Sequence, residues 1–471
     1  MSDMDIAKKN DLTFKMAPFL DVHMISSVLD FLREIELYDS KVIAKEKIRV
    51  LMKTNMLELV QDEINTIPAD DKSIHGDPNL SKEHLEDSTN KIFDKIDNET
   101  DAVKLCTEFF SDMELVESLK AGSNLTIEYV SAHHGITQQV LEEYYKFSKF
   151  KYDCGMYCDA EEMLGNFLSV AQAQTTSVLG ALWGRLACRI LQAKWDESLT
   201  DINAVKDAIE SRSIAPMDQL RQRAWLMHWG LLVFLNQRDG FDALYHFFSE
   251  KIYLQTIENV CPWLLRYYTC AAILSSHRRA VMMDVLNEIL ATSYLHSDPM
   301  TQFVESVYER FDFEEAQQRL SECLILMKND FFLQIYADKF LHEARLLLCE
   351  VYCAINRRVN MVTLAEKLQL SEDEAERWMV EMVRGAVQSN AQEGSTTDSS
   401  SAAVTTLNAR IDSSGKQVLM APPPKMVHQK VADRTRDLTV RAGILNSNLE
   451  NLMNEQGEYI MRQQQMRSQS A

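Results

Sequence analysis

The segment from Asn360 to Met420 constrains the fold most, because it combines two helix signatures with a hairpin signature. Asn360 can cap a first helix, and Ser371 with Glu374 has the capping-box pattern of a second helix. Two short strands then follow, separated by a Ser-Ser-Gly turn. Their alternating apolar residues are Leu407, Ala409, Ile411, Val418 and Met420. Helix, tight turn, helix and hairpin predict a winged helix.

The charges on the second predicted helix argue against nucleic acid as its ligand. Between Ser371 and Arg384, only Arg377 and Arg384 oppose the acidic side chains, which are Glu372, Asp373, Glu374, Glu376 and Glu381. Affinity for DNA or RNA rests mainly on Lys and Arg contacts with phosphates. The pattern therefore favours a winged helix that binds proteins. A winged-helix regulator that binds nucleic acid is the alternative from another class.

Composition favours a large helical body. The chain has 471 residues, of which 46% are apolar, with only 14 Gly and 9 Pro. Together with long amphipathic stretches, these values favour an all-α fold. The net charge is −21; residues 401–471 hold nine Lys and Arg against six Asp and Glu, or +3, so residues 1–400 carry −24. Such an acidic body repels nucleic acid and anionic membranes in bulk.

A short pattern of an aromatic residue, two others and a small residue recurs between residues 126 and 335. It occurs at Tyr157–Ala160, Trp195–Ser198, Tyr268–Ala271 and Phe313–Ala316. The separations are 38, 73 and 45 residues, near multiples of a unit of slightly under 40. The small residue would let the two helices of a pair approach each other. The pattern predicts an α-solenoid of tetratricopeptide-like helix pairs.

The segments before the repeats are expected to differ from each other. Residues 1–66 have the pattern of N-terminal helices, whereas residues 67–125 form an acidic variable segment with weak helix. Within the acidic segment we expect a flexible loop over residues 68–90 and helix from Ile92 to Leu119. The run Val28–Leu37 also fits a leucine-rich export signal, but a packed helix is the stronger interpretation.

The segments after the repeats carry the expected partner surfaces. A helix from Phe331 to Ile355 would lead into the winged helix at 336–425, which contains a disordered insertion at 389–406. Residues 426–471 form a last helix and tail. Its heptad rows are Val431, Leu438, Leu445, Leu452 and Tyr459, and more weakly Thr435, Ala442, Leu449 and Gln456. Such a seam predicts partner helices, and packing back on its own domain is the equal alternative.

The sequence lacks motifs of an enzyme or a cofactor site. It has no Gly-x-Gly-x-x-Gly, no phosphate loop and no Gly-x-Ser-x-Gly. His228 lies in an apolar helical run, which predicts a core histidine. Among the nine cysteines, Cys154 with Cys158 and Cys349 with Cys353 are i, i+4 pairs, but neither has the second pair of ligands that zinc requires. We expect no catalytic residue, cofactor, metal or small-molecule substrate.

The ends and apolar runs give no sign of export or membrane insertion. Met1–Asp11 is polar, and the longest apolar run, Trp225–Leu235, is too short to cross a bilayer. We therefore expect a cytoplasmic protein without membrane contact, and leave a minor nuclear pool open.

Helical repeats, a winged helix and a further C-terminal helix together resemble the PCI family, whose domain would span about residues 215–425. This family supplies scaffold subunits to the proteasome lid, the signalosome and eukaryotic translation initiation factor three, and the match is closest to its e-subunit branch in the initiation factor. The resembling segments are Phe19–Asp21 with His23, Thr54–Met56, Tyr144–Leu164, Leu182–Gly184, Trp225–Trp229, Cys261–Pro262, Leu265–Tyr267, Asp298–Pro299, Phe303–Glu305, Phe311–Phe313, Asn329–Phe332, Leu364–Leu368, Glu374–Trp378 and Ala409–Asp412. Residues 62–125, the insertion and the end of the tail depart from the family pattern.

The resemblance implies a non-catalytic scaffold subunit of initiation factor three that supports small-ribosomal-subunit binding and mRNA recruitment. The implied partners are other PCI subunits and the d subunit, and, through the complex, the small ribosomal subunit and the mRNA-recruiting scaffold factor. Direct RNA contact stays open, and a subunit of the lid or signalosome is the alternative. We expect the wing strands to offer unpaired backbone groups to a neighbouring sheet. The expected interface residues are Leu407, Ala409, Ile411, Val418 and Met420 on the wing and Leu438, Leu445, Leu449 and Leu452 on the last helix.

Overall fold

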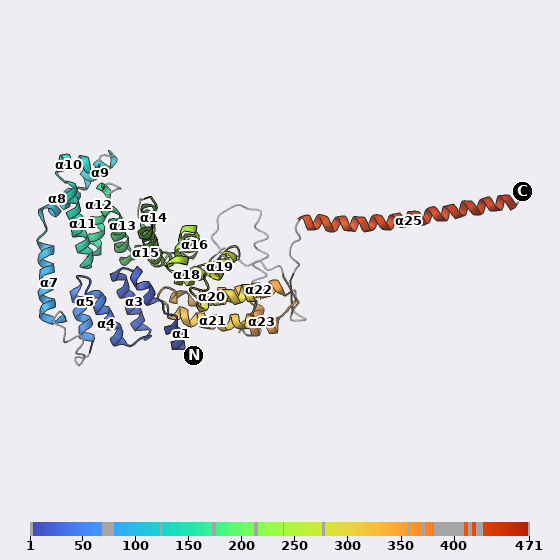
Figure 1. Cartoon of the computed structure of the whole chain (residues 1–471), viewed down its shortest axis with the longest axis horizontal. Helices are drawn as coiled ribbons and strands as arrows, with labels where there is room; N and C mark the ends of the chain where they lie inside the picture. The colour runs from blue at the N-terminus through green and yellow to red at the C-terminus, as the bar shows by residue number, and fades with distance from the viewer. Residues whose placement is uncertain are drawn as a thin grey trace.

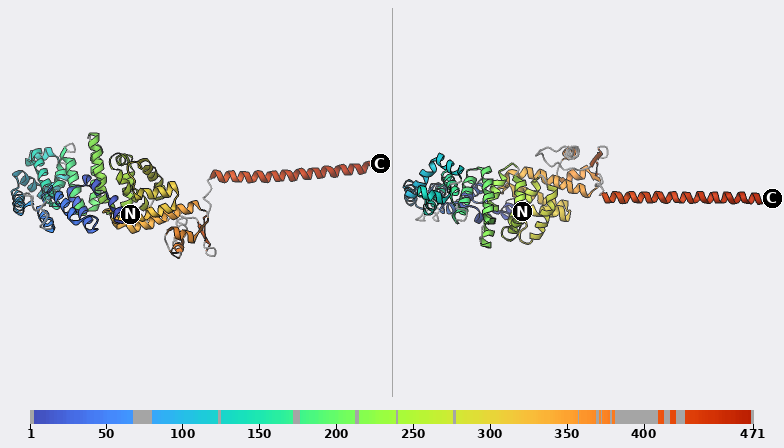
Figure 2. Two further views of the ribbon diagram at one scale, coloured as in Figure 1. Left: turned by 60° about the horizontal axis from the view of Figure 1, so that its bottom comes forward. Right: turned by 90° about the horizontal axis from the view of Figure 1, so that it is seen from above.

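The computed structural model shows a helical body with one long helix projecting from it, which confirms the predicted fold class (Figure 1). Figure 2 shows from two further directions that the long helix points away from the body. Among the described residues, no helix is both long enough and apolar enough to span a membrane. The structure describes residues 3–67, 80–122, 125–171, 176–211, 215–238, 240–275, 278–356, 358–368, 371, 373–377, 379–380, 409–412, 417–420 and 427–469.

The N-terminal segment forms short helices, two of which are capped by aspartate side chains. They are α1 (Asp3–Lys9), α2 (Thr13–Met16), η1 (Ala17–Phe19), α3 (Val22–Glu34), α4 (Ser40–Leu51) and α5 (Leu57–Thr66). Asp21 caps α3 by accepting a hydrogen bond from the His23 N–H, and Asp39 caps α4 in the same way. The apolar residues Val28, Leu29, Phe31, Leu32 and Leu37 are buried. The interpretation of Val28–Leu37 as a packed helix is therefore confirmed up to Glu34, where α3 ends, and Leu37 is buried beyond the helix.

The acidic segment contains more helix than the sequence suggested. It forms α7 (Lys82–Asp97), α8 (Asp101–Ser111) and α9 (Met113–Ala121). The expected loop over 68–90 is wrong from Lys82 onward, because the Ser81 side chain caps α7 and Leu85 is buried against α4 and α5. Residues 68–79 lie outside the described part of the chain.

The repeats form a continuous series of helices that pack on their neighbours in sequence from α11 to α16. Small residues make this close packing feasible: Ala160, Ser198, Ala271 and Ala316 are all fully buried. Tyr157, Trp195 and Phe313 begin a helix, but Tyr268 lies inside one, so the third occurrence of the pattern is not equivalent. The helices are α10 (Ile127–His134), α11 (Gln138–Asp153), α12 (Tyr157–Val170), α13 (Thr176–Leu191), α14 (Trp195–Ser211), α15 (Pro216–Leu235), α16 (Gly240–Ser249), α17 (Lys251–Asn259), η3 (Pro262–Leu264), α18 (Leu265–Leu274), α19 (Arg278–Thr292), α20 (Pro299–Glu305), η4 (Ser306–Arg310), α21 (Phe313–Lys328), η5 (Gln334–Tyr336) and α22 (Ala337–Ile355).

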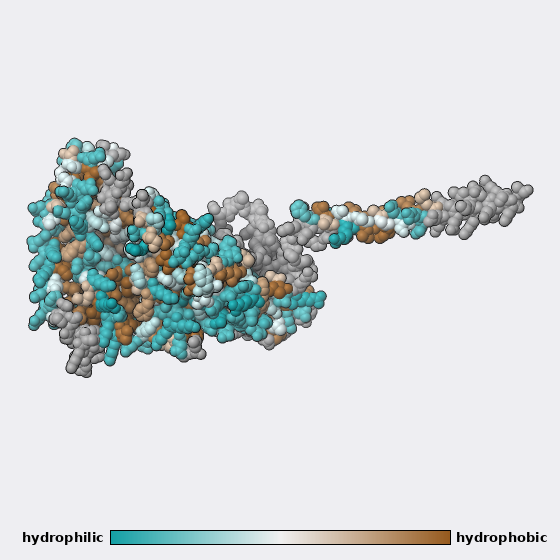
Figure 3. Space-filling model, viewed as in Figure 1, coloured by the Kyte–Doolittle hydropathy of each residue, from teal (hydrophilic) through white to brown (hydrophobic). Residues whose placement is uncertain are grey.

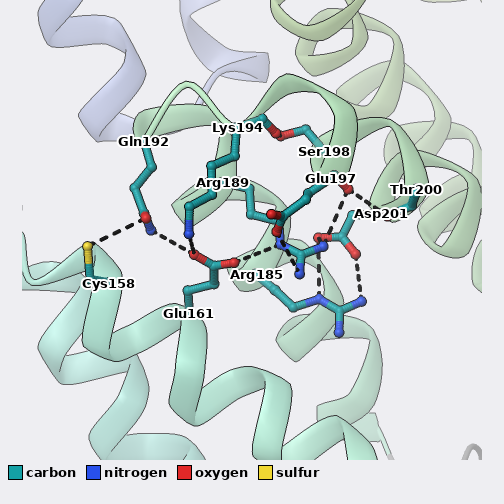
Figure 4. A network of polar contacts seen from close by, with 10 residues as sticks. All are labelled: Cys158, Glu161, Arg185, Arg189, Gln192, Lys194, Glu197, Ser198, Thr200 and Asp201. Atoms are coloured by element: carbon teal, nitrogen blue, oxygen red, sulfur yellow. Dashed lines mark hydrogen bonds and ion pairs between the residues drawn. The ribbon is translucent and has the colours of Figure 1, made fainter.

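A polar network locks α12, α13 and α14 together at one end (Figure 4). Arg189 on α13 bonds Glu161 on α12 at 2.9 Å and the buried Asp201 on α14 at 2.9 Å. Lys194 reaches Glu161 at 2.7 Å. Burial by itself would raise the pKa of Glu161, but hydrogen bonds from Lys194 and Arg189 lower it overall. These contacts fix the angle between successive helices of the solenoid.

The N-terminal segment runs along the repeats and is bonded to them at several points. The Tyr152 hydroxyl donates to Asp21 at 2.7 Å, and Trp229 Nε1 donates to the Phe19 carbonyl at 3.0 Å. The backbone N–H of Asn55 donates to the carbonyl of Asp153 at 3.0 Å. Leu12, Met16 and Met24 belong to the same hydrophobic core as the repeat helices. The first helices are therefore part of one body with the solenoid.

A buried ionic network joins the N-terminal segment to the later helices of the body. Arg266 on α18 donates to Asp298 at 2.8 Å, to Asp330 at 3.1 Å and to the Asn10 carbonyl at 2.7 Å. Burial alone would raise the pKa of Asp298, but Arg266 holds it well below its usual range. Burial outweighs Arg266 at Asp330, whose pKa is raised. A single guanidinium thus links the N-terminus to α18, α20 and the segment after α21.

The helix expected from Phe331 begins six residues later, at Ala337. The Asp330 side chain is held by Arg266 and accepts a hydrogen bond from the Phe332 N–H at 3.0 Å. Phe331 packs edge-to-face on Phe31, with ring centroids 5.6 Å apart. These contacts hold residues 331–336 as a turn and a short 3-10 helix, η5, in place of the first turns of α22.

Candidate protein-interaction surfaces

The winged-helix region has both predicted helix caps. In α23 (Met361–Leu368), the Val362 N–H donates to Asn360 Oδ1 at 3.2 Å. At the next helix, the Glu374 N–H donates to Ser371 Oγ at 3.4 Å, and the Ser371 N–H donates back to Glu374 at 3.1 Å. Residues 373–377 and 379–380 are helical. The capping patterns read from the sequence are confirmed.

The small sheet has three strands rather than a hairpin alone. The strands are β1 (Arg358–Asn360), β2 (Ala409–Asp412) and β3 (Gln417–Met420), in the antiparallel order β1-β3-β2. Val418 on β3 pairs with Val359 on β1 and with Ile411 on β2. The sequence does not predict β1, because three residues are too few to show an alternating pattern.

The third strand changes where a partner strand could be added. Because β3 lies between β1 and β2, its backbone is paired on both sides, and Val418 is fully buried. The expectation that the returning strand would be exposed is therefore wrong for Gln417 to Leu419, and Val418 offers no free strand edge, whereas Met420 pairs with Ala409 on β2 and lies beyond the described pairing with β1. Ala409 and Ile411 lie on β2, which pairs only with β3 among the described residues. Leu407 lies outside the described residues.

The described part of the second helix presents acidic groups to solvent. Asp373, Glu374 and Glu376 are exposed, and Arg377 is the one basic residue in the described stretch 373–377. Hydrogen bonds from Ser371 lower the pKa of Glu374. This surface repels phosphates, which agrees with the preference for a protein ligand.

The last helix, α25 (Val427–Gln469), is 43 residues long and exposes its apolar rows. Leu438, Leu445, Leu449 and Leu452 are 56% to 62% exposed. Figure 3 shows apolar side chains along its described surface. The alternative in which this seam packs back on its own domain does not hold for these residues. A regular apolar seam left open to water is suited to other helices.

The histidine and cysteines singled out in the sequence lie in packed surroundings. His228 is fully buried and stacks on Phe19, with ring centroids 4.6 Å apart. Its Nε2 accepts from Trp263 Nε1 at 3.1 Å, so Nδ1 carries the proton donated to the Ala224 carbonyl at 2.7 Å. Burial lowers the pKa of His228 to about 4. The prediction of a core histidine is confirmed.

The cysteines are all free thiols. Cys349 and Cys353 are buried with their sulfur atoms 3.9 Å apart, whereas Cys154 is half-buried and Cys158 exposed. Among the described residues, no three or more His, Cys, Asp or Glu side chains gather in a way that could hold a metal ion.

Comparison with known protein families gives two matches, one near the N-terminus and one in the region of α21 to the winged helix. Residues 11–151 match the N-terminal domain of eIF3 subunit 6, and residues 322–386 match the PCI domain. The N-terminal match includes the stretch 62–125, in which the sequence itself showed little resemblance.

Relatives named as the E subunit of eukaryotic translation initiation factor 3 cover nearly the whole chain. The protein of Aspergillus clavatus is 31% identical over 94% of this chain and 93% of its own length. That of Yarrowia lipolytica is 31% identical over 93% and 98%, and that of Arabidopsis thaliana is 32% identical over 93% and 96%.

These relatives decide between the assemblies that the resemblance left open, in favour of the initiation factor over the proteasome lid and the signalosome. Translation factors as relatives agree with the expected cytoplasmic location and with a subunit that is not an enzyme. The chain therefore belongs to the E-subunit family of eukaryotic translation initiation factor 3, and so to the components of a multi-subunit translation initiation factor.

Proposed function

We propose that this subunit is a scaffold whose C-terminal surfaces hold sister subunits, and that through them it supports small-ribosomal-subunit binding and mRNA recruitment. The observation that carries the proposal is the row of exposed apolar side chains along α25, beside a body whose exposed apolar residues are scattered around a continuous buried core. An exposed apolar surface of this kind is removed from water when partner chains cover it.

The seam of α25 supplies the larger part of the association energy. Fully burying one leucine side chain contributes about 1.5–3 kcal/mol, so four leucines contribute at most about 6–12 kcal/mol to association, part of which offsets the entropy lost when side chains become ordered. Helices in proteins gain most of their stability when their apolar face packs on other elements. We therefore assign Leu438, Leu445, Leu449 and Leu452 to a bundle with helices of sister subunits.

The edge of β2 supplies direction and specificity. Its outer backbone groups can pair with a strand of a neighbouring PCI subunit, which would extend the three-stranded sheet. Ala409 and Ile411 are the residues of this contact. Two different surfaces, a strand edge and a helix seam, would fix both the position and the orientation of the neighbour.

The contacts with RNA are proposed to be indirect. The exposed acidic side chains of the second helix of the winged helix leave no favourable surface for phosphates. By family resemblance, the d subunit and the mRNA-recruiting scaffold factor would meet the N-terminal helices and the convex side of the solenoid. The subunit then brings RNA to the complex through proteins that it holds.

The test is a charge placed in the seam of α25. With Leu445→Glu and Leu452→Glu together, we expect the tagged chain to lose most co-purifying subunits while its body keeps its melting temperature. The matched control, Ser447→Glu with Asn451→Glu, adds the same charges off the seam and should retain them. Undiminished recovery of the sister subunits with the leucine variant would contradict the proposal.

A further inference from the structure

A groove of about 590 Å³ opens where the N-terminal segment crosses the repeats, and the proposed use of β2 and α25 does not involve it. Its walls come from residues 18–21 and from helices α11, α12, α13 and α15, labelled in Figure 1. Three tryptophans form one side. Trp183 meets Trp229 edge-to-face at 4.7 Å between ring centroids, and it meets Trp225 in the same manner at 6.3 Å.

The aromatic wall is held rigid by its own hydrogen bonds. Trp183 Nε1 donates to Gln222 at 2.7 Å, and Trp229 Nε1 donates to the Phe19 carbonyl at 3.0 Å. Trp225 is half-buried and stands nearer to solvent. A groove whose side chains are already fixed costs little ordering entropy when a ligand enters.

The lining of the groove also carries an excess of negative charge. Asp21 accepts hydrogen bonds from the Tyr152 hydroxyl at 2.7 Å and from the His23 N–H at 3.0 Å. Burial raises the pKa of Asp153; attraction by Lys149 and His23 opposes this rise, and repulsion by Asp21 adds to it. Among the described residues that line the groove, Lys149 is the one basic side chain. Two carboxylates against one ammonium leave the site short of a positive charge.

We propose that this groove binds a segment of a partner protein in which an arginine side chain stands between apolar side chains. A guanidinium can bond to carboxylates and stack on aromatic rings at once, which an ammonium does less well. Apolar neighbours of the arginine would cover Leu164, Leu179 and Trp225. The volume is within the range of sites that enclose a few side chains, and the carboxylates disfavour a nucleic acid.

The first test uses the native complex. A photo-crosslinking benzoylphenylalanine replaces the exposed Lys149, and for comparison the exposed Lys120 on α9. After illumination, mass spectrometry should identify at position 149 a partner segment with arginine between apolar residues, absent from the crosslinks at position 120. Crosslinks to RNA, to a segment without arginine, or to nothing beyond those at position 120 would overturn the proposal.

The second test uses a synthetic peptide of the crosslinked segment and the full-length chain. Asp153→Asn should weaken peptide binding at least about tenfold, and Lys149→Gln should tighten it, because a like charge is removed. A misfolded chain cannot bind more tightly, so the second variant separates recognition from damage. Glu143→Gln, on the same helix but outside the groove, should leave binding unchanged. Equal peptide affinities for the parent chain and the three variants would reject the proposal. An unchanged affinity of the parent chain for a peptide whose arginine is replaced by glutamine would also reject it. The groove is remote in sequence from β2 and α25. If β2 and α25 proved not to bind sister subunits, the results of these two tests would therefore not change.

Discussion

The body up to α22 buries even a guanidinium, whereas α25 leaves its leucines more than half exposed. In the body, Arg266 has carboxylate and carbonyl partners in its own chain. Along α25, the apolar rows of the described residues face solvent over several heptads. The body therefore neutralises its buried charge within the chain, whereas α25 has an apolar surface that the described residues of its own chain do not cover. We therefore expect α25 to be the region that assembles with other subunits.

The largest effect is expected when the buried positive charge of the body is removed. We expect Arg266→Met to destabilise the body by about 3–5 kcal/mol, because Asp298 and Asp330 are left buried without their guanidinium partner. The carbonyl of Asn10 also loses its donor. Thermal unfolding of the isolated chain measures the change.

The control for Arg266 is an arginine whose carboxylate partner is more accessible. Arg223 bonds Glu210 at 2.7 Å, with 18% and 30% of their side chains exposed. Arg223→Met should cost less than about 1 kcal/mol. Equal melting temperatures for the two variants would show that the body does not depend on its buried network.

The second prediction concerns the pH dependence of the stability of the body. His228 is neutral in the fold, where its pKa is about 4, and it gains a proton near the ordinary histidine value of about 6.5 when unfolded. The unfolded chain therefore binds more protons between these values, so stability is complete above them and falls as the pH drops. We expect the loss at pH 5, relative to pH 7, to include about 2 kcal/mol from this residue.

The variant His228→Gln tests this assignment. An amide can still accept from Trp263 and donate to the Ala224 carbonyl, but it does not titrate. Chemical denaturation at the two pH values should show a smaller acid loss for the variant than for the parent chain. The same acid loss in both chains would assign it to other groups.

The sequence predicted the features that depend on local patterns. Capping at Asn360 and at Ser371, the burial of the small residue in each repeat and the burial of His228 all follow from spacing along one helix. The heptad rows of α25 stay a prediction of its seam, because apolar side chains outside these rows, such as Ile444 and Met453, are exposed as well.

The features that the sequence did not predict depend on residues distant in the chain. β1 becomes a strand because β3, almost sixty residues away, pairs with it. The late start of α22 depends on Arg266, and the start of α7 depends on contacts with α4 and α5. The groove also needs the N-terminal segment beside α11 to α15, an arrangement that no single stretch of sequence encodes.

A third, smaller prediction concerns the junction between the two regions. Asn360→Ala removes the cap of α23 and should destabilise this helix by about 1 kcal/mol. Hydrogen exchange should become faster in residues 361–368 but not in α18. Asn259→Ala, which removes a surface hydrogen bond at the end of α17, is the control. Faster exchange throughout the body would show that the winged helix and the solenoid unfold as one unit.

The smallest effect is expected for removal of residues 389–406, which lie outside the described part of the chain. Their Ser, Thr, Ala and Gln content offers little apolar surface to bury, so neither the body nor the seam of α25 should depend on them. We expect the shortened chain to keep its melting temperature within a few degrees and to co-purify with its sister subunits. A larger fall in melting temperature would show that the insertion packs on the body, whereas lost subunits at an unchanged melting temperature would place a partner contact within the insertion itself.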